Sequence, residues 1–502
     1  MRIFTFCSLI ATPITFSNKN TEKIHRTFPF LAKRCRINFI QIRQRDIVMK
    51  RANFPFRLTF LAAGLALLTA CHSIIYQPAK TIEHIYLQSG YRLENVMQQA
   101  LQKENLVIMT FSGGSSRAAS LGYGVLEQFK NASVRPTEKG DTLLQNIDVV
   151  YGVSGGSVLA AYFAQEGQDV IPKFNESFLK KDFQKKVINE VFSMSNVPRL
   201  TSPQFGRSDL LQEQLNLALY KGKKFADLAQ HRKGPFAVIN ATDMAMGQKI
   251  SFTQDFFDWL CLDLNDIEIA RAVAASSAVP LIFSPVTLNN HGGSCHIHNK
   301  KAMLTEQPGY WLLLNNFNAM EKRFARYQNN PEKTYLHLVD GGLTDNLGLA
   351  SLLDMSNLLS MHELYTELKK SNLRNIVVVN VNAQNENTSQ IDKSADVPGV
   401  KEVVNTVISV PIDKATESTL QYSQKFADQW NAYTKRKKDV KIKIYFVNLS
   451  LRNLPEGQLK TDVLHIGTSF YLPESDVDKL REAAKILLEQ SKEYQEALKA
   501  LQ

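Results

Sequence analysis

Two stretches in which a short apolar run leads through a glycine turn into a helical pattern constrain the fold of this chain most strongly. The first runs from Leu106–Phe111 through a turn at Gly113-Gly114 to a helical pattern between residues 115 and 130. The second runs from Ile147–Tyr151 through the turn Gly152–Gly156 to a helix from about residue 157 to 165. Apolar runs without polar alternation are typical of strands buried on both faces of a parallel sheet. The two units therefore predict an α/β fold, a three-layer sandwich with a mainly parallel central sheet and a helical C-terminal tail.

The same patterns place the remaining elements. We expect further strands and helices, the last helix with Ser475 as its N-cap, at these positions: strands Phe236–Asn240, Leu336–Val339, Ile376–Val381 and Ile442–Leu449; helices Ile267–Ser276, Gly348–Leu359, Val400–Lys435 and Ser475–Leu498. No long Pro/Gly/Ser linker follows Lys80. We therefore expect residues 105–350 to form the core of one domain, residues 351–502 to complete it with a terminal helix, and the amphipathic residues 71–104 to act as a tether.

The net charge of +11 is concentrated before Cys71. That leading segment has 12 Lys and Arg against 2 Asp and Glu, whereas the rest of the chain has 47 against 46. The body of the protein is therefore close to neutral, and its charge gives no support to a nucleic-acid partner.

The segment before Cys71 has the features of a secretory signal in the right order. Positive residues from Met49 to Arg57 precede the apolar run Leu58–Leu68, which is too short for a comfortable transmembrane helix. The sequence Leu68-Thr69-Ala70-Cys71 then resembles the lipobox of bacterial lipoproteins. This resemblance implies a signal peptide over residues 49–70, a lipid on Cys71 and a membrane-anchored protein; the alternative is a buried helix that happens to end in cysteine.

Two further expectations follow from this resemblance. The second residue of the mature chain would be His72 and not Asp, which by similarity to Gram-negative sorting rules implies the outer membrane of a bacterial envelope. Because a secretory signal rarely begins so far from its charged start, we interpret residues 1–48 as a gene-start artefact. Outside the cytoplasm the remaining thiols, Cys261 and Cys295, can pair. We predict that disulfide, with two free buried cysteines as the alternative.

The sharpest chemical motif is Gly152-Val153-Ser154-Gly155-Gly156, placed where a strand hands over to a helix. At such an elbow a serine has a strained backbone, and any larger neighbour would collide with the adjoining elements. The hydroxyl then lies near a helix N-terminus, which favours developing negative charge. The motif indicates a nucleophilic serine, although glycine-rich turns also serve structure alone.

Two other segments strengthen this interpretation. Gly113-Gly114-Ser115-Ser116-Arg117 follows the first buried strand, and consecutive glycines let backbone amides converge on an anion, as in an oxyanion hole. A phosphate-binding turn is the alternative, but the spacing does not match a nucleotide fingerprint. The second segment, Asp340-Gly341-Gly342, ends an apolar strand; alone it predicts only a turn.

In this order the three segments resemble the patatin-like phospholipase family. Its pattern combines a Gly-Gly-Gly-x-Arg loop, a Gly-x-Ser-x-Gly elbow and Asp-Gly-Gly or Asp-Gly-Ala. By position, the resemblance implies Ser154 as nucleophile, Asp340 as general base, and the amides around Gly113, Gly114 and Ser115 as oxyanion donors, with Arg117 bracing the turn or meeting a head group. It also implies that Ala275–Pro280, similar to the family's Ala-Ser-x-Ala-x-Pro segment, packs near the site. No metal or other cofactor is implied.

One departure is Ser115, which stands where the family has a third glycine. If that position requires positive φ, serine there is strained and the loop stabilises an oxyanion less well.

A histidine distinguishes a catalytic triad from a dyad, and after Asp340 only His362 and His465 could serve. We expect His362 to be solvated and His465 to be packed. His291, His296 and His298 near Cys295 predict a polar loop and not a metal site.

The leading hypothesis is a membrane-anchored serine acyl hydrolase that uses a Ser–Asp dyad on lipid acyl esters, like a phospholipase A or lysophospholipase. The alternatives are a catalytically silent lipid-binding or envelope-scaffolding lipoprotein, and an α/β-hydrolase esterase with a Ser–Asp–His triad. The expected partners are a membrane lipid substrate and the membrane itself.

Overall fold

The computed structural model describes residues 76–306, 311–350, 352–354, 359–386 and 395–502. These residues belong to one compact unit. The predicted gene-start segment, the signal peptide and Cys71 lie outside the described residues. Within the described ranges, no helix combines the length and the apolar character needed to cross a membrane.

An eight-stranded, mostly parallel sheet forms the centre of this unit, in the order β10-β9-β1-β4-β5-β8-β7, with β6 paired to β5. The strands are β1 (Asn105–Phe111), β4 (Val149–Val153), β5 (Phe236–Asp243), β6 (Gln248–Ser251), β7 (Val286–Asn289), β8 (Tyr335–Val339), β9 (Asn375–Asn382) and β10 (Lys443–Ser450). From β10 to β5 neighbouring strands are parallel, and β6, β7 and β8 add antiparallel pairs. β2 (Ser133–Thr137) and β3 (Gly140–Thr142) form a separate hairpin.

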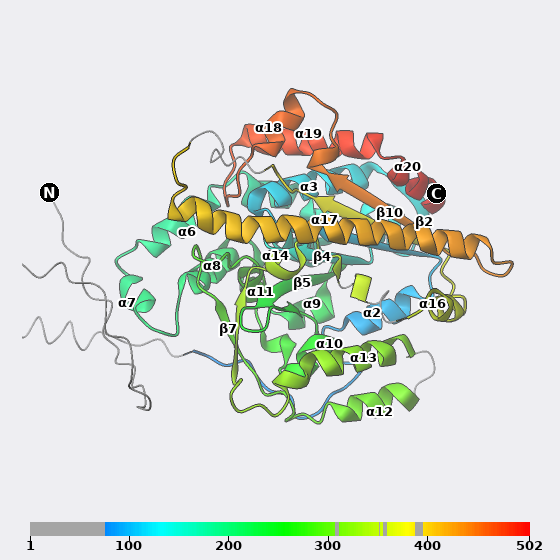
Figure 1. The fold of residues 1–502 in the computed structure, drawn as a ribbon, viewed down its shortest axis with the longest axis horizontal. Coiled ribbons are helices and arrows are strands. Elements are labelled where there is room, and N and C mark those ends of the chain that lie inside the picture. The colour runs from blue at the N-terminus through cyan, green and yellow to red at the C-terminus, as the bar shows by residue number, and fades with distance from the viewer. Residues whose placement is uncertain (1–75, 307–310, 351, 355–358, 387–394) are drawn as a thin grey trace, which may run out of the picture. The chain divides into compact units, whose positions relative to one another are not determined.

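Helices cover both faces of the sheet. Gly122 of α3 (Ser115–Asn131) lies against Phe111, whereas α17 (Val400–Lys435) contributes Phe426 to a cavity of about 140 Å³ that Leu106 and Ile108 also line. Because successive strand residues point to opposite faces, α3 and α17 lie on opposite sides of β1. Figure 1 shows the long α17 helix running across the view beside the strands.

Other helices complete these layers. They are α2 (Leu93–Ala100), α4 (Gly155–Glu166), α5 (Val170–Phe174), α6 (Phe183–Val191), α7 (Val197–Leu200), α8 (Arg207–Leu215), α9 (Phe225–His231), α10 (Gln254–Phe257), α11 (Ile269–Ser276), α12 (His298–Glu306), α13 (Trp311–Phe324), α14 (Gly342–Asp345), α16 (Met361–Leu368), α18 (Gln458–Leu464), α19 (Glu474–Gln490) and α20 (Lys492–Leu501). Because β9 and β10 belong to the same sheet as β1, the C-terminal part of the chain completes the same unit.

The C-terminal helix differs from the prediction. It is two helices, α19 and α20, and α19 begins at Glu474 after Pro473, so Ser475 is not its N-cap. The break occurs at Ser491, whose hydroxyl accepts a hydrogen bond from the Tyr494 amide at 3.1 Å and starts α20. A local cap thus interrupts a continuous apolar period. The predicted helix Gly348–Leu359 lies partly outside the described residues; residues 350 and 352–354 are helical.

The segment expected to be a tether packs against the unit from residue 76 onward. Tyr91 is buried; its hydroxyl donates to the Ala237 carbonyl at 3.0 Å and accepts from the Ala237 amide at 2.7 Å. Arg92 forms an ion pair with Asp258 at 2.7 Å. The buried aromatic ring and the ion pair fix this segment to β5 and to the loop after α10, and an extended tether would make neither contact.

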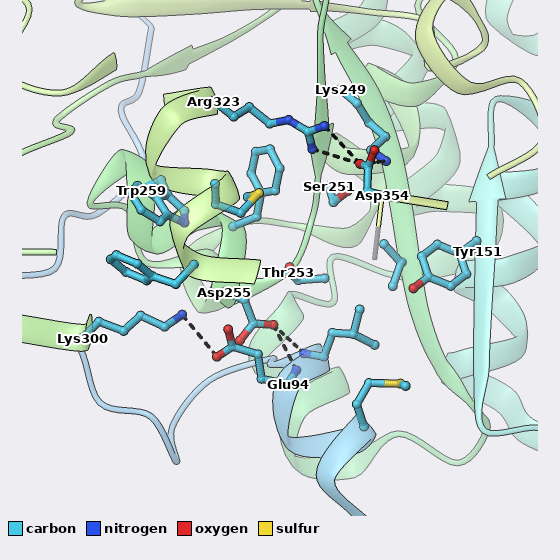
Figure 2. Close-up of a pocket in the computed structure, with 16 residues that line it drawn as sticks. Glu94, Tyr151, Lys249, Ser251, Thr253, Asp255, Trp259, Lys300, Arg323 and Asp354 are labelled. Carbon is cyan, nitrogen blue, oxygen red and sulfur yellow. Dashed lines mark hydrogen bonds and ion pairs between the residues drawn. The ribbon is translucent and has the colours of Figure 1, made fainter. Parts of the chain in front are cut away.

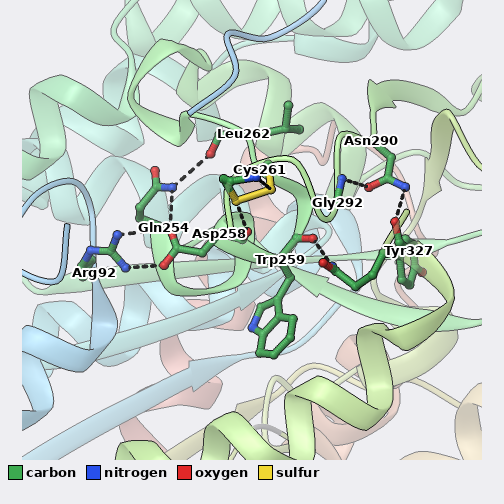
Figure 3. The surroundings of a disulfide bond; sticks show 11 residues. Arg92, Gln254, Asp258, Trp259, Cys261, Leu262, Asn290, Gly292 and Tyr327 are labelled. Carbon is green, nitrogen blue, oxygen red and sulfur yellow. Dashed lines mark hydrogen bonds and ion pairs between the residues drawn. A yellow bond between two sulfur atoms is a disulfide. The ribbon is translucent and has the colours of Figure 1, made fainter. Parts of the chain in front are cut away.

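Cys261 and Cys295 form a disulfide, the pair predicted from the sequence, with their Cα atoms 5.5 Å apart (Figure 3). The bond lies beside a buried charge cluster, in which Asp258 pairs with Arg92 and with Lys300, the latter at 3.1 Å. This covalent link and these ion pairs connect three segments that are distant in the sequence: the one before α2, the one after α10 and the one before α12.

Candidate active site

Ser154 lies in the turn between β4 and α4, with φ of 50° and ψ of −124°. Positive φ is unfavourable for a non-glycine residue, so the surrounding packing must hold this conformation. The neighbouring glycines make that packing possible. A Cβ on Gly155 would lie 2.0 Å from the Ser115 carbonyl oxygen, and one on Gly156 would lie 2.5 Å from the Phe111 carbonyl oxygen. On Gly152 it would lie 2.6 Å from the nearest backbone atom. All three positions therefore require glycine.

Asp340 follows β8 directly and is buried. Burial raises the pKa of its carboxyl group to about 6, while hydrogen bonds from the Gly342 amide and the Ser154 side chain lower it. The Gly342 amide donates at 2.8 Å. The structure thus brings together Ser154 and Asp340, which are 186 positions apart in the sequence. The carboxyl group has a pKa at which it can take up and return a proton near neutral pH.

The end of α11 connects the serine turn and the aspartate turn. The Ser276 hydroxyl accepts a hydrogen bond from the Ser154 amide at 2.9 Å and donates to the Asn240 carbonyl at 2.6 Å. The Gly341 amide donates to the Ser276 carbonyl at 3.1 Å, and the Asp340 amide donates to the carbonyl of Ala278 at 3.0 Å. One short segment therefore positions both candidate reacting residues.

The loop after β1 lies against the serine turn, because a Cβ on Gly155 would meet the Ser115 backbone. The Gly113 amide donates to the Asn346 carbonyl at 3.0 Å, so it is not available to an oxyanion in this structure. In the described part of the chain, the amides of Gly114 and Ser115 have no acceptor. Ser115 has φ of 50° and Gly114 has φ of 135°. The loop therefore adopts the left-handed conformation that the sequence raised as a possible source of strain at Ser115.

Arg117, which follows this loop, holds it against two segments of the C-terminal part of the chain. The buried guanidinium donates to the Ala383 carbonyl at 2.7 Å, to the Ile466 carbonyl at 2.6 Å and to the Asn385 side chain at 3.2 Å. Burial lowers its pKa to about 10. Because all three acceptors belong to the protein, the structural role proposed from the sequence describes this residue better than contact with a lipid head group.

Residues 109–353 match the family model of the patatin-like phospholipases, and this segment contains every residue of the site described above except the partners of Arg117. The chain carries a patatin-like phospholipase domain. The family and the α/β fold class predicted from the sequence are confirmed by this match, and the family is one of lipid acyl hydrolases.

No curated protein sequence matches the chain. Among solved structures, human GIVD cytosolic phospholipase A2 aligns with a TM-score of 0.41 and 12% identity over 81% of this chain. The chain spans only 65% of that protein's length. The complex of the same human protein with methyl gamma-linolenyl fluorophosphonate inhibitor and terbium chloride aligns with a TM-score of 0.36 and 12% identity, over 84% of this chain and 67% of that one. VipD from Legionella pneumophila aligns with a TM-score of 0.28 and 12% identity, over 87% of this chain and 73% of the VipD chain.

Two residues of the patatin-like domain were missed as contributors to the site. Ser276 lies in the segment that resembles the family's Ala-Ser-x-Ala-x-Pro motif, so its place near the site was predicted but its hydrogen bond with Ser154 was not. Asn346 accepts from Gly113 through its carbonyl, and its side-chain oxygen lies 2.5 Å from where a Gly113 Cβ would be. Because a backbone acceptor can be any residue, the sequence carries no signal for Asn346.

Among the described residues, neither candidate histidine forms a hydrogen bond with Ser154 or Asp340. His362 lies exposed in the first turn of α16, as expected, with its Nδ1 atom 3.2 Å from the Tyr433 hydroxyl. His465 was expected to be packed, but it is exposed after α18, with its Nδ1 atom 2.6 Å from the Thr461 carbonyl oxygen. The flanking Leu464 and Ile466 take the buried positions, so the apolar neighbours misled the prediction.

Cys295 is in the disulfide, so its thiolate is not available to a metal beside the three histidines of its loop.

A cavity of about 120 Å³ lies away from this site, between β4–β6 and helices α2 and α13 (Figure 2). Neither Ser154 nor Asp340 lines it. Its charged side chains pair with one another: Lys300 with Glu94 at 3.2 Å, and Arg323 with Asp354 at 3.1 Å. Because these charges neutralise each other, the cavity has the character of a structural ion-pair cluster.

Proposed function

We propose that this chain is a lipid acyl hydrolase in which Ser154 is the nucleophile and Asp340 is its general base. The observation that carries the proposal is that the Ser276–Ala278 segment holds the turns of both Ser154 and Asp340 by hydrogen bonds, and that burial raises the pKa of the Asp340 carboxyl group to about 6. At neutral pH most of this carboxyl group is ionised and can accept the hydroxyl proton. A serine with a base in hydrogen-bonding contact is the arrangement that covalent acyl transfer requires.

The reaction proceeds in two steps. As Asp340 takes the hydroxyl proton, the Ser154 oxygen attacks the ester carbonyl, and the amides of Gly114 and Ser115 donate to the oxyanion. Asp340 then gives its proton to the leaving alcohol, which departs and leaves an acyl group on Ser154. Asp340 next takes a proton from water, the resulting attack passes through a second oxyanion, and the fatty acid leaves as Ser154 regains its proton.

Ester turnover by single variants tests this assignment. Ser154→Ala and Asp340→Asn should each lower kcat by at least about 10³-fold, whereas His465→Ala should not. A fluorophosphonate probe should label the wild type but not Ser154→Ala. Wild-type turnover that survives in Ser154→Ala would refute the nucleophile. A folded wild type that neither turns over acyl esters nor reacts with the probe would favour a catalytically silent lipid-binding protein.

We also propose that Cys71 carries a lipid that anchors the enzyme to a bacterial envelope membrane, with the outer membrane as the expected location. The support is the ordered charge, apolar run and Leu68-Thr69-Ala70-Cys71 sequence. Several acyl chains anchor firmly because each buried methylene contributes about 0.8 kcal/mol. Metabolic labelling with palmitate should mark the wild type and not Cys71→Ser. Equal labelling of both would exclude this anchor.

A further inference from the structure

Large apolar side chains are exposed in two segments near the candidate active site. The loop that follows α11 exposes 69% of Leu281 and 60% of Ile282, and the segment between α6 and α7 exposes 79% of Phe192 and 83% of Met194. Neighbouring Ile188 and Val197 are also exposed. We call these six side chains the apolar rim. Large exposed apolar patches mark surfaces that bind a protein partner or a membrane.

The Leu281–Ile282 loop follows closely after Ser276–Ala278, the segment that holds the Ser154 and Asp340 turns. It begins three residues after Ala278, whose carbonyl accepts from the Asp340 amide. Leu281 has φ of 71°, and its carbonyl accepts from the Arg207 guanidinium at 2.9 Å. A leucine held in a left-handed conformation while most of its side chain faces water is doubly unfavourable. Such an arrangement is stabilised if the side chain enters an apolar environment.

The α6–α7 segment is joined to the same loop through a buried aromatic seam. Phe183 of α6 and Phe283 each lie 5.9 Å from the ring of Phe470. Next to Phe470, the Ser469 carbonyl accepts a hydrogen bond at 2.9 Å from the amide of Ser116, which follows the loop after β1. Both parts of the apolar rim are therefore tied to the elements that hold the candidate active site.

The N-terminal half of α17 adds a second apolar stripe on the same side of the molecule. Val400, Val403, Val407 and Val410 recur at helical spacing and are all exposed. In Figure 1 this end of α17 lies on the side where α6 and α7 lie. Further along the helix, the Thr416 hydroxyl accepts from the Asn346 side chain at 3.4 Å, which places α17 beside the aspartate turn.

The rim is flanked by positive charge, although the body of the protein is close to neutral. Four exposed lysines lie there: Lys180 and Lys181 directly before α6, and Lys185 and Lys186 within it. The last two lie seven and six residues before Phe192 in the sequence. Exposed apolar side chains combined with neighbouring lysines are typical of segments that lie in the interface of an anionic bilayer.

We propose that the apolar rim and the lysines of α6 dock this protein on a bilayer that contains anionic lipid, with the candidate active site facing the membrane. The inference rests on the proposed function only for its consequence, that docking presents lipid esters to Ser154. Docking itself requires no catalysis. It is therefore tested by binding, in the Ser154→Ala background, separately from turnover.

The binding experiment uses the full chain carrying Cys71→Ser and Ser154→Ala, so that neither an attached lipid nor hydrolysis contributes. Flotation with vesicles of phosphatidylcholine and phosphatidylglycerol should show binding. Leu281→Ser with Ile282→Ser, and Phe192→Ser with Met194→Ser, should each weaken it by at least about tenfold. Leu217→Ser is the matched control, because Leu217 is 76% exposed but lies in the π-helix Asn216–Tyr220 that follows α8, outside the apolar rim. Lys185→Glu with Lys186→Glu should weaken binding to the anionic vesicles and not the weaker binding to pure phosphatidylcholine.

Two outcomes would overturn the docking surface. One is vesicle binding by the rim variants that equals that of the Leu217→Ser control. The other is a rim that holds two copies of the chain together, seen as a dimer that the rim substitutions dissociate while vesicle binding stays unchanged.

Ester turnover separates a failure of membrane docking from a failure of the proposed hydrolase function. With Ser154 restored, the rim variants should keep wild-type kcat/KM on a dissolved short-chain ester and lose activity on vesicles. Absence of wild-type turnover on the dissolved ester would refute the proposed function and leave the binding result standing.

Discussion

At the residue scale, the candidate site stores backbone strain where two loops meet. Ser115 and Ser154 both have φ of 50°, and the space that a Cβ on Gly155 would need is filled by the Ser115 backbone. Strain of this kind persists only where neighbours over-determine the backbone. The glycine pattern predicted the elbow, because close approach demands residues without a Cβ. The pattern could not predict which amides of the loop after β1 stay without an acceptor. The Gly113 amide is occupied by the backbone carbonyl of Asn346, and any residue at that position could supply this carbonyl.

The pKa of Asp340 predicts how activity depends on pH. Because burial raises this pKa to about 6 and the base must be ionised, kcat/KM should be constant above about pH 7 and fall about tenfold for each pH unit below 6. A pH profile measured with a dissolved ester, whose own charge does not change, reports the free enzyme. A profile that stays flat down to pH 4.5 would contradict the assignment of Asp340 as base.

Gly155→Ala should abolish the elbow. The new Cβ would lie 2.0 Å from the Ser115 carbonyl oxygen, so the serine turn or the oxyanion loop must move. Since a displacement of about 1 Å can cost about 10²-fold in rate, we expect kcat to fall by that factor or more. Gly467→Ala is the control, because its Cβ would meet no atom within 4 Å. Equal kcat values for the two variants would show that the close contact does not position the serine.

At the element scale, prediction succeeded where a strand is buried on both faces. β1, β5, β9 and β10 were located to within a few residues, because a continuous apolar run bounded by turns is typical of a strand in a parallel sheet. β8 was located as well, although it pairs antiparallel with both neighbours and its burial alternates. Short β6 and β7 were missed, since four residues carry too little periodicity. The helices between α4 and β5 were also missed: they are short, and π-turns interrupt them, so no apolar period extends far enough to detect.

The contact between the end of α11 and the serine turn predicts a positioning role for Ser276. Ser276→Ala removes the acceptor of the buried Ser154 amide. It should lower the free energy of unfolding by about 1–3 kcal/mol, because the amide is left unpaired, and lower kcat about tenfold with KM unchanged. Urea denaturation and steady-state kinetics measure the two effects.

Ser277→Ala is the matched control for this variant, because the buried Ser277 hydroxyl has no partner among the described residues. Its removal should change neither kcat nor stability by a measurable amount. A Ser276→Ala variant that loses stability with unchanged kcat would mean that Ser276 supports the fold without positioning Ser154.

At the scale of the whole molecule, a body whose net charge is close to zero exposes apolar side chains and lysines together between residues 180 and 197, beside the exposed Leu281–Ile282 loop. The sequence predicted the membrane partner from the leader, but not the apolar rim, because exposure of Leu281 or Phe192 depends on what the fold leaves uncovered. In the same way, the segment before α2 looked like a tether until its partners were known. Arg92 and Tyr91 bury their side chains against residues about 150 positions later, and no local pattern reports such contacts.

The disulfide connects this N-terminal contact to the rest of the unit, and its loss should affect stability without affecting catalysis. It closes a loop of 34 residues, for which the chain-entropy model gives about 3–4 kcal/mol. Neither cysteine contacts Ser154, Asp340 or Ser276. Cys261→Ala with Cys295→Ala should therefore lower the free energy of unfolding by that amount while kcat on a dissolved ester at 25 °C stays within about twofold. Reductant should reproduce the loss in the wild type and leave the double variant unchanged. If the wild type unfolds at the same urea concentration with and without reductant, the bond contributes no stability to this fold, and the buried ion pairs around Asp258 must hold the N-terminal segment by themselves.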